Sequence, residues 1–162
     1  MEKKDIYEYF AELFGCYVSD LRMNHQADWD AKLEALLPVL RGEVPAHFHA
    51  HRADDIATAL RIANEFSLRC VMIHGTEGYR IADLLAAERV HVIAGPIIGD
   101  RSKPELRNQT PATPGILSGA GVPTAIITDH PVIPIQYLPV CAGLAVREGM
   151  DYEEARRAIT IN

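Results

Sequence analysis

The chain has 162 residues, 48% hydrophobic and 23% charged, with a formal net charge of −6. This composition is typical of one soluble globular domain and excludes a disordered chain. The acidic balance and scattered arginines argue against nucleic-acid binding, which needs clustered Lys and Arg to neutralise phosphates, and no apolar run reaches the roughly 18 residues that a membrane span requires.

The three cysteines lie far apart in the sequence, at Cys16, Cys70 and Cys141. They form no Cys-x-x-Cys pair, and no apolar leader segment follows Met1. A reducing compartment suits such a set of thiols, so we expect a cytoplasmic protein.

Helical spacing of apolar residues dominates the first forty residues. One stripe runs through Ile6, Phe10 and Phe14, and a second follows Trp29. This spacing predicts helices over about 2–40. We interpret 1–43 as a helical lead-in to the rest of a single domain, 1–162.

From residue 44 onward, short apolar runs alternate with helical patterns. The runs predict strands at 44–49, 68–74, 90–95 and 122–128. Helices are predicted between them and after them, at 54–66 behind an Asp54 N-cap, at 77–88, briefly at 115–121, through 142–149, and from 151.

This alternation predicts consecutive βα units around a parallel sheet. Four such units, spanning 44–162, make an α/β fold that is half of a TIM-like (β/α)8 barrel. A small doubly wound open sheet is the alternative, but the Gly-rich phosphate loop typical of that fold is missing after the first strand.

Polar residues stand where these predicted strands end. The first run ends at His49, the second at His74, and Asp129 follows the fourth. A single strand-end histidine is more often structural, but three equivalent positions would converge at one mouth of a parallel barrel. Two imidazoles and a carboxylate suit zinc or a similar divalent ion, and Asp129 could also serve as the general base.

Other polar residues are candidates for weaker roles. Alternate spacing puts His47, His49 and His51 on one face of a strand, so that His51 could contact substrate while His47 points into the barrel below the site. His130 could bind substrate, support the metal site or stabilise a turn.

The loop after the third strand is long for a βα connection, and long loops at such a mouth often bind substrate. Its Arg101 and Lys103 could hold a substrate carboxylate. A solvated loop with local ion pairs is the equal alternative.

Four segments together resemble the amidohydrolase superfamily, and most closely its imidazolonepropionase-like branch. They are His-Ala-His-Arg-Ala-Asp-Asp-Ile at 49–56, His-Gly-Thr-Glu at 74–77, Gly-Pro at 95–96 with Lys-Pro-Glu-Leu-Arg-Asn at 103–108, and Thr-Asp-His-Pro at 128–131. The resemblance implies a metal-dependent hydrolase with His49 on barrel strand five, His74 on strand six and Asp129 on strand eight. Water activated by zinc, or by iron or manganese, would attack the carbon of an amide or cyclic amide C–N bond, and Asp129 would carry its proton to the leaving nitrogen.

The chain also departs from the pattern of that superfamily. Members carry a His-x-His on the first barrel strand, and binuclear members add a Lys or Glu on the fourth, but neither feature precedes residue 44. We therefore expect a C-terminal half-barrel fragment, with a loosely held metal or none. Its hydrolase activity should depend on the missing N-terminal half of the barrel.

The exposed strand edges of such a fragment predict pairing with that half or self-association into a homo-oligomer. The main alternative function is a non-catalytic metal-binding or interaction domain that kept the scaffold. An open-sheet nucleotide binder is a weaker third option.

Overall fold

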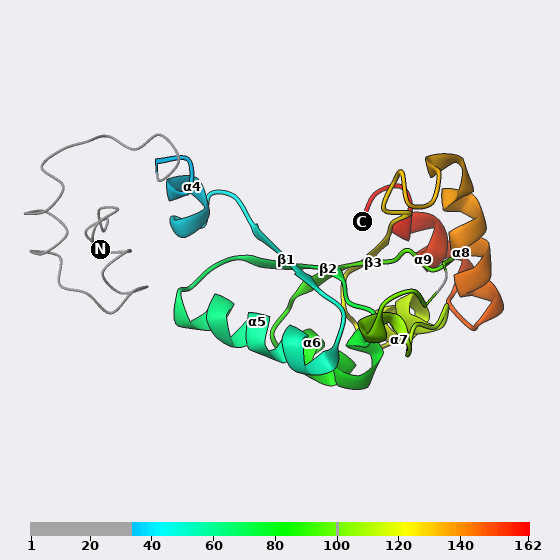
Figure 1. Cartoon of the computed structure of the whole chain (residues 1–162), viewed down its shortest axis with the longest axis horizontal. Coiled ribbons are helices and arrows are strands. Elements are labelled where there is room, and N and C mark those ends of the chain that lie inside the picture. Colours follow the sequence, from blue (N-terminus) through cyan, green and yellow to red (C-terminus); the bar gives the residue numbers. More distant parts are fainter. Residues whose placement is uncertain (1–33, 100) are drawn as a thin grey trace, which may run out of the picture. The chain divides into compact units, whose positions relative to one another are not determined.

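The computed structural model describes residues 34–99 and 101–162 of the chain (Figure 1). Most of the expected lead-in at 1–43 therefore lies outside the described residues. The described residues form two compact units: one consists of 34–46 and 62–69, and the other of 47–61, 70–99 and 101–162.

The first unit contains the short helix α4 (Leu37–Leu40), which has Pro38 in its first turn. Leu37 is buried. The carbonyl of Arg69 accepts a hydrogen bond from the Ala46 N–H at 2.7 Å, and the Arg69 guanidinium donates to the carbonyl of Gly42 at 3.2 Å. These bonds join the two segments of the unit.

A four-stranded parallel sheet forms the centre of the second unit, apart from the first residue of β1. Its strands are β1 (Ala46–Ala50), β2 (Cys70–His74), β3 (His91–Ala94) and β4 (Thr124–Ile126), in the order β1-β2-β3-β4. Each strand falls within a predicted apolar run or one residue beyond it. His74 pairs with Ala94, and Ala94 with Ile126, so the strands end together at one edge.

Helices follow the strands as predicted, which confirms the α/β class. They are α5 (Ala53–Glu65), η1 (Gly78–Ile81), α6 (Ala82–Ala87), η2 (Pro104–Leu106), α7 (Thr113–Gly119), η3 (Ile135–Tyr137), α8 (Leu138–Arg147) and α9 (Tyr152–Ala158). Helix α8 begins earlier than predicted because Pro139 lies in its first turn, where a missing N–H leaves no intrahelical bond unmade. Asp151 caps α9, accepting from the Glu154 N–H at 3.0 Å. None of the described helices is long and apolar enough to span a membrane.

The start of α5 differs from the prediction. Asp54, the expected N-cap, lies inside the first turn, where its carboxylate pairs with Arg52 at 2.9 Å. The N–H of Ala53 is bonded instead by Oε2 of Glu77, at 3.1 Å. A side chain 24 residues further along the chain therefore satisfies a donor at this helix end, as an N-cap would.

Helices α5, α6 and α7 cover one face of the sheet (Figure 1). The core on that face is almost fully buried, since four of its large side chains have no accessible surface: Ile56, Met72, Leu85 and Leu117. A second cluster joins Ile126 of β4 to α8 and α9 through Cys141, Ala145 and Ala155. Burying apolar area of this kind is the main stabilising term of the fold.

Adjacent leucines on α6 test this assignment. Leu85 is fully buried, whereas Leu84 is 39% exposed. Leu85→Ala should lower the free energy of unfolding by about 2–5 kcal/mol because it leaves a cavity. Leu84→Ala is the matched control and should cost far less. Urea unfolding followed by circular dichroism measures both, and equal losses would contradict the packing described.

Candidate metal centre

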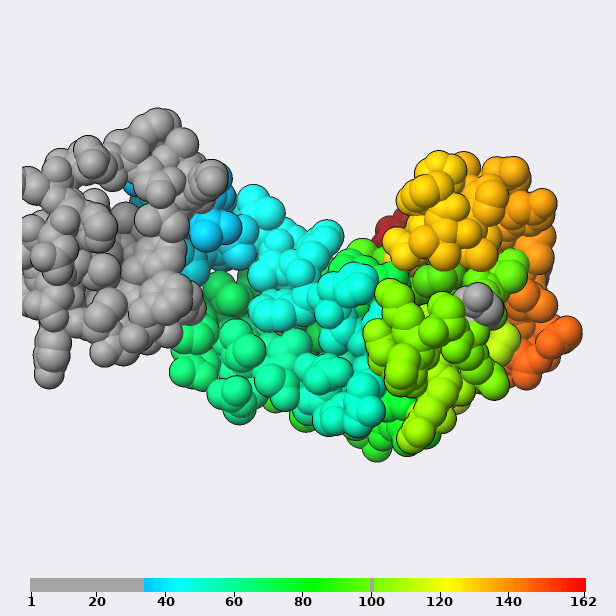
Figure 2. Space-filling model, in the orientation of Figure 1, coloured from blue at the N-terminus to red at the C-terminus, as the bar shows by residue number. Residues whose placement is uncertain are grey.

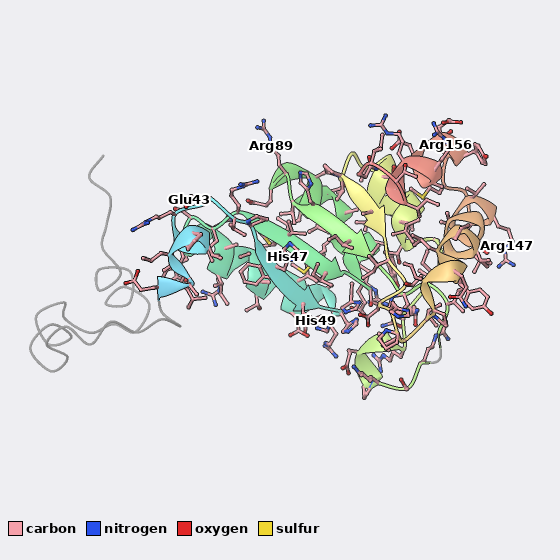
Figure 3. All side chains as sticks on the ribbon, turned by 90° about the horizontal axis from the view of Figure 1, so that it is seen from above. Glu43, His47, His49, Arg89, Arg147 and Arg156 are labelled. Atoms are coloured by element: carbon pink, nitrogen blue, oxygen red, sulfur yellow. The ribbon has the colours of Figure 1, made fainter. Side chains whose placement is uncertain are left out.

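Three imidazoles meet at the carboxyl ends of β1 and β2. His49 lies in β1, His51 directly follows that strand, and His74 is the last residue of β2. One ring nitrogen from each lies within 4.8 Å of the others. In Figure 3, His49 lies nearer than His47 to the end of β1. Nitrogen donors grouped in this way could hold a metal ion.

His74 is held by hydrogen bonds at both ring nitrogens. Its Nδ1 lies 2.5 Å from the carbonyl oxygen of Gly95, and its Nε2 lies 2.5 Å from Nε2 of His49. Because a carbonyl only accepts, Nδ1 carries the proton, and neutral His74 presents an unprotonated Nε2 to the cluster. This is the ring orientation expected of a metal ligand.

The Gly95 carbonyl is available because its residue is a glycine. Gly95 has a φ of +138°, in the region that L side chains rarely adopt, and a Cβ there would collide with the carbonyl oxygen of Ile127. The end of β3 therefore passes close to the segment after β4 while bonding the end of β2.

His51 is anchored through both its ring and its backbone. Its Nδ1 lies 2.8 Å from Oγ1 of Thr76, and its carbonyl accepts from the Glu77 N–H at 2.8 Å. The His51 and His74 rings stack at 4.6 Å with 20° between their planes. These contacts hold His51, which lies outside any strand, beside His74, which ends β2.

Two of the three rings favour the neutral form. Burial lowers the pKa of His51 to about 4, and repulsion by His74, His49 and Lys103 adds to the effect. Burial also lowers the pKa of His74, although its bond to Gly95 and the charge of Asp129 oppose this. Neutral imidazole is the form that binds metal ions.

Glu77 ties three segments together beside the cluster, and sequence reasoning did not identify this role. Its Oε1 accepts from Asn108 at 2.5 Å and its Oε2 from the Ala53 N–H at 3.1 Å. Burial would raise the pKa of this carboxyl group, but these hydrogen bonds and the nearby Arg80 and Arg52 lower it. A buried carboxylate that accepts such bonds holds the start of α5 and the long loop after β3 in place.

The loop after β3 has further attachments near the cluster. Gln109 donates to the carbonyl of Pro96 at 2.5 Å, which closes the loop, and Arg101 donates to the carbonyl of Gln109 at 3.1 Å. Because Pro96 directly follows Gly95, both ends of the loop lie next to residues that hold the imidazoles.

The predicted position of His47, below the site, agrees with the structure. His47 lines a separate hollow of about 600 Å³, as does His91. Other residues around it are Val71, Ile93, Ala125 and Arg157. Figure 2 shows this recess beside the C-terminal residues, coloured dark red.

The structure is similar to the crystal structure of an amidohydrolase from Thermotoga maritima MSB8, with a TM-score of 0.82 and 39% sequence identity. The chain has an amidohydrolase-like fold. The match covers 96% of this chain but 42% of the other, so the chain spans less than half the length of that amidohydrolase. No protein-family model and no curated protein matches it significantly.

The amidohydrolase-like fold confirms the predicted half of a TIM-like barrel, with four parallel strands and flanking helices. The imidazolonepropionase-like branch stays a prediction, as does the ligand set of His49, His74 and Asp129. The structure places two members of that set together and adds His51 to them.

Asp129 and His130 follow β4 and are exposed. Asp129 has a φ of +54°, and its carbonyl accepts from the Val132 N–H at 2.8 Å, so it begins a tight turn. It lies outside the three-histidine group, although its charge raises the pKa of His74. In the amidohydrolase-like fold its carboxylate is thus near the imidazoles without bonding them.

Arg101 and Lys103 take different positions in their loop. Arg101 donates a hydrogen bond to the Gln109 carbonyl of its own loop, so it has a local partner, as in the alternative of a solvated loop. Lys103 is exposed, and its positive charge lowers the pKa of both His51 and His74. Of the two cations, Lys103 is therefore the one with its charge directed toward the imidazoles.

Stability of the metal-free protein should depend on pH through the lowered pKa of His51. Between the ordinary value of 6.5 and the folded value of about 4, the unfolded chain binds more protons than the folded one. Acidification across this range should therefore lower the melting temperature, and His51→Gln should make the decrease shallower. Thermal melts with a chelator measure this, and an unchanged slope in the variant would refute it.

Glu77→Gln should destabilise the protein by about 1–3 kcal/mol. The amide has one accepting oxygen for two donors, so either Asn108 or the Ala53 N–H loses its partner. Hydrogen exchange in 96–112 should rise in parallel. Exposed Glu43 provides the control, Glu43→Gln. Equal stability of the two variants in urea would exclude the proposed tie.

Proposed function

We propose that this chain is part of a metal-dependent hydrolase that cleaves C–N bonds of amides or cyclic amides. The observation that supports it most directly is the convergence of His49, His51 and His74 at the carboxyl ends of β1 and β2. This convergence occurs in a chain of which 96% matches part of an amidohydrolase, with 39% sequence identity.

The donor set fits a borderline divalent cation, and zinc is the proposed metal, with iron or manganese as alternatives. Imidazoles that stay neutral, and a ring fixed through its Nδ1 bond to Gly95, are what such an ion requires. When bound, the ion would supply Lewis acidity and a lowered pKa for a water molecule.

Asp129 is the proposed proton carrier. It follows β4 at the same edge of the sheet as His74, and it is exposed, so a substrate can reach its carboxylate. A carboxylate at this position can accept the proton of the attacking water and return it to the leaving nitrogen. In the proposed site Asp129 also contributes an oxygen ligand beside His49 and His74.

Lys103 is the proposed contact for a negatively charged part of the substrate. Its ammonium group has no hydrogen bond or ion pair with any residue in 34–99 or 101–162, and its field reaches His51 and His74. Arg101 can also contact the substrate once its hydrogen bond to the Gln109 carbonyl is broken. His130 is a further proposed substrate contact, since it is exposed next to Asp129.

The proposed partner is the remaining half of a barrel. Strands β1 and β4 are the edges of the sheet, and parallel sheets are normally covered on both faces. Strands β1 to β4 within 44–162 then correspond to barrel strands five to eight of an imidazolonepropionase-like enzyme, and self-association through the edges is the alternative. The free thiols of Cys70 and Cys141 suit the proposed cytoplasmic location.

Complementation tests the hydrolase proposal. The chain is mixed with a second polypeptide that carries the part of the Thermotoga maritima amidohydrolase outside the match, and hydrolysis of cyclic amides, dipeptides and acylated amino acids is measured. Turnover should appear with the two together and be lost on removing metal with a chelator. No turnover from a mixture that forms a stable complex would favour the non-catalytic alternative.

Two variants then test the roles of the site residues in the active complex. His49→Ala and Asp129→Asn should each lower kcat by several orders of magnitude. Asp129→Asn should leave metal binding partly intact, because nitrogen ligands remain. Single-turnover kinetics and metal analysis measure this, and near-normal turnover in either variant would refute the assignment. His47→Ala, on the same strand as His49, should leave kcat unchanged.

A further inference from the structure

We propose that His51 is a metal ligand, so that His49, His51 and His74 form a three-nitrogen site contained in this chain. This role differs from the substrate contact that the sequence predicts for His51. It rests on the metal dependence proposed above but not on hydrolysis. It also implies that the chain binds metal well without ligands from another part of a barrel.

The first argument is the distance between donors. In a tetrahedral site, zinc–nitrogen bonds of about 2.0–2.1 Å place two ligand nitrogens about 3.4 Å apart. One nitrogen from each of the three rings lies within 4.8 Å of the others. The donors therefore lie within about 1.5 Å of the spacing that one zinc ion requires. Rotations about the side-chain bonds would bring all three onto the ion.

The second argument is the arrangement of the rings. His51 and His74 stack at 4.6 Å, while the His49 ring stands nearly perpendicular to both, at 5.4 Å from His51 and 4.1 Å from His74. Catalytic zinc sites have three protein ligands and a free fourth position, and these three clustered imidazoles supply that number of nitrogen donors.

The third argument is the bond between His51 and Thr76. Among the described residues, Thr76 is the hydrogen-bond partner of this ring, through Nδ1, and Nε2 has none. Metal-binding histidines characteristically use one ring nitrogen for an outer partner and the other for the metal. His74 shows the same arrangement with Gly95. Thr76 and Glu77 together fix both ring and backbone of His51.

The three-nitrogen site makes metal binding less dependent on Asp129. Asp129 lies outside the three-histidine group, so its carboxylate is not needed to complete a three-ligand site. The chain by itself should therefore bind zinc more tightly than a site of two imidazoles and one exposed carboxylate.

Zinc titration of the full chain tests the proposal directly. Protein stripped with a chelator is titrated with Zn²⁺ in competition with a chromophoric indicator, and with Co²⁺ by visible absorption. The unmodified chain should bind one equivalent. His51→Gln should weaken Zn²⁺ binding by more than the ~10–100-fold typical of losing an outer hydrogen bond, and the Co²⁺ spectrum should change. Thr76→Val should fall within that ~10–100-fold range.

His47→Gln is the matched control, because His47 lies on the same strand and lines the separate hollow. It should leave the Zn²⁺ affinity unchanged. Circular dichroism melts in chelator verify that each variant folds. If His51→Gln does not fold, Thr76→Val carries the test, since it removes one hydroxyl and keeps the shape.

The results separate this proposal from the hydrolase proposal. Zinc affinity unaffected by His51→Gln, or by Thr76→Val where it carries the test, would overturn the role of His51, as would no stoichiometric zinc binding by the unmodified chain. If complementation yields no hydrolysis but zinc binding depends on His51, the metal site stands and the hydrolase proposal fails. If hydrolysis appears while His51→Gln keeps full affinity, the reverse holds.

Discussion

The hydrogen bond between His74 Nδ1 and the Gly95 carbonyl joins the ends of β2 and β3, and the arrangement of the site depends on it. It fixes which nitrogen of His74 faces His49. The bond requires a glycine, because a side chain at Gly95 would collide with the backbone after β4. It also places Pro96, and with it the start of the long loop, beside the imidazoles. One contact thus couples sheet geometry, ring orientation and the position of the loop.

Glu77 has a comparable role on the other side of the cluster. Its backbone N–H holds the carbonyl of His51, and its carboxylate holds the start of α5 and Asn108 of the loop. A carboxylate can accept several bonds at once, which neither a neutral amide nor a hydroxyl does as well. The residues that shape the site are therefore more numerous than the imidazoles that form it.

The two faces of the sheet contrast strongly. One is sealed by α5, α6 and α7 over a dry core, and the other carries the hollow lined by His47 and His91. The chain spans less than half the length of the amidohydrolase whose fold it resembles. Within the described residues, the three imidazoles lie together although this face is open. Under the two proposals, metal binding would need this chain alone, whereas hydrolysis would need the rest of a barrel.

The sequence by itself determined the order of elements and the class of fold. Apolar runs and helical spacing depend on neighbouring residues, so β1 to β4 and α5 to α9 were predictable in kind and nearly in position. His49 and His74 were found for the same reason, because they end predicted strands. Tertiary structure decided the rest. Asp54 lost its expected capping role to Glu77, and His51 joined the cluster, because both depend on contacts between residues 24 to 25 apart that no local pattern records.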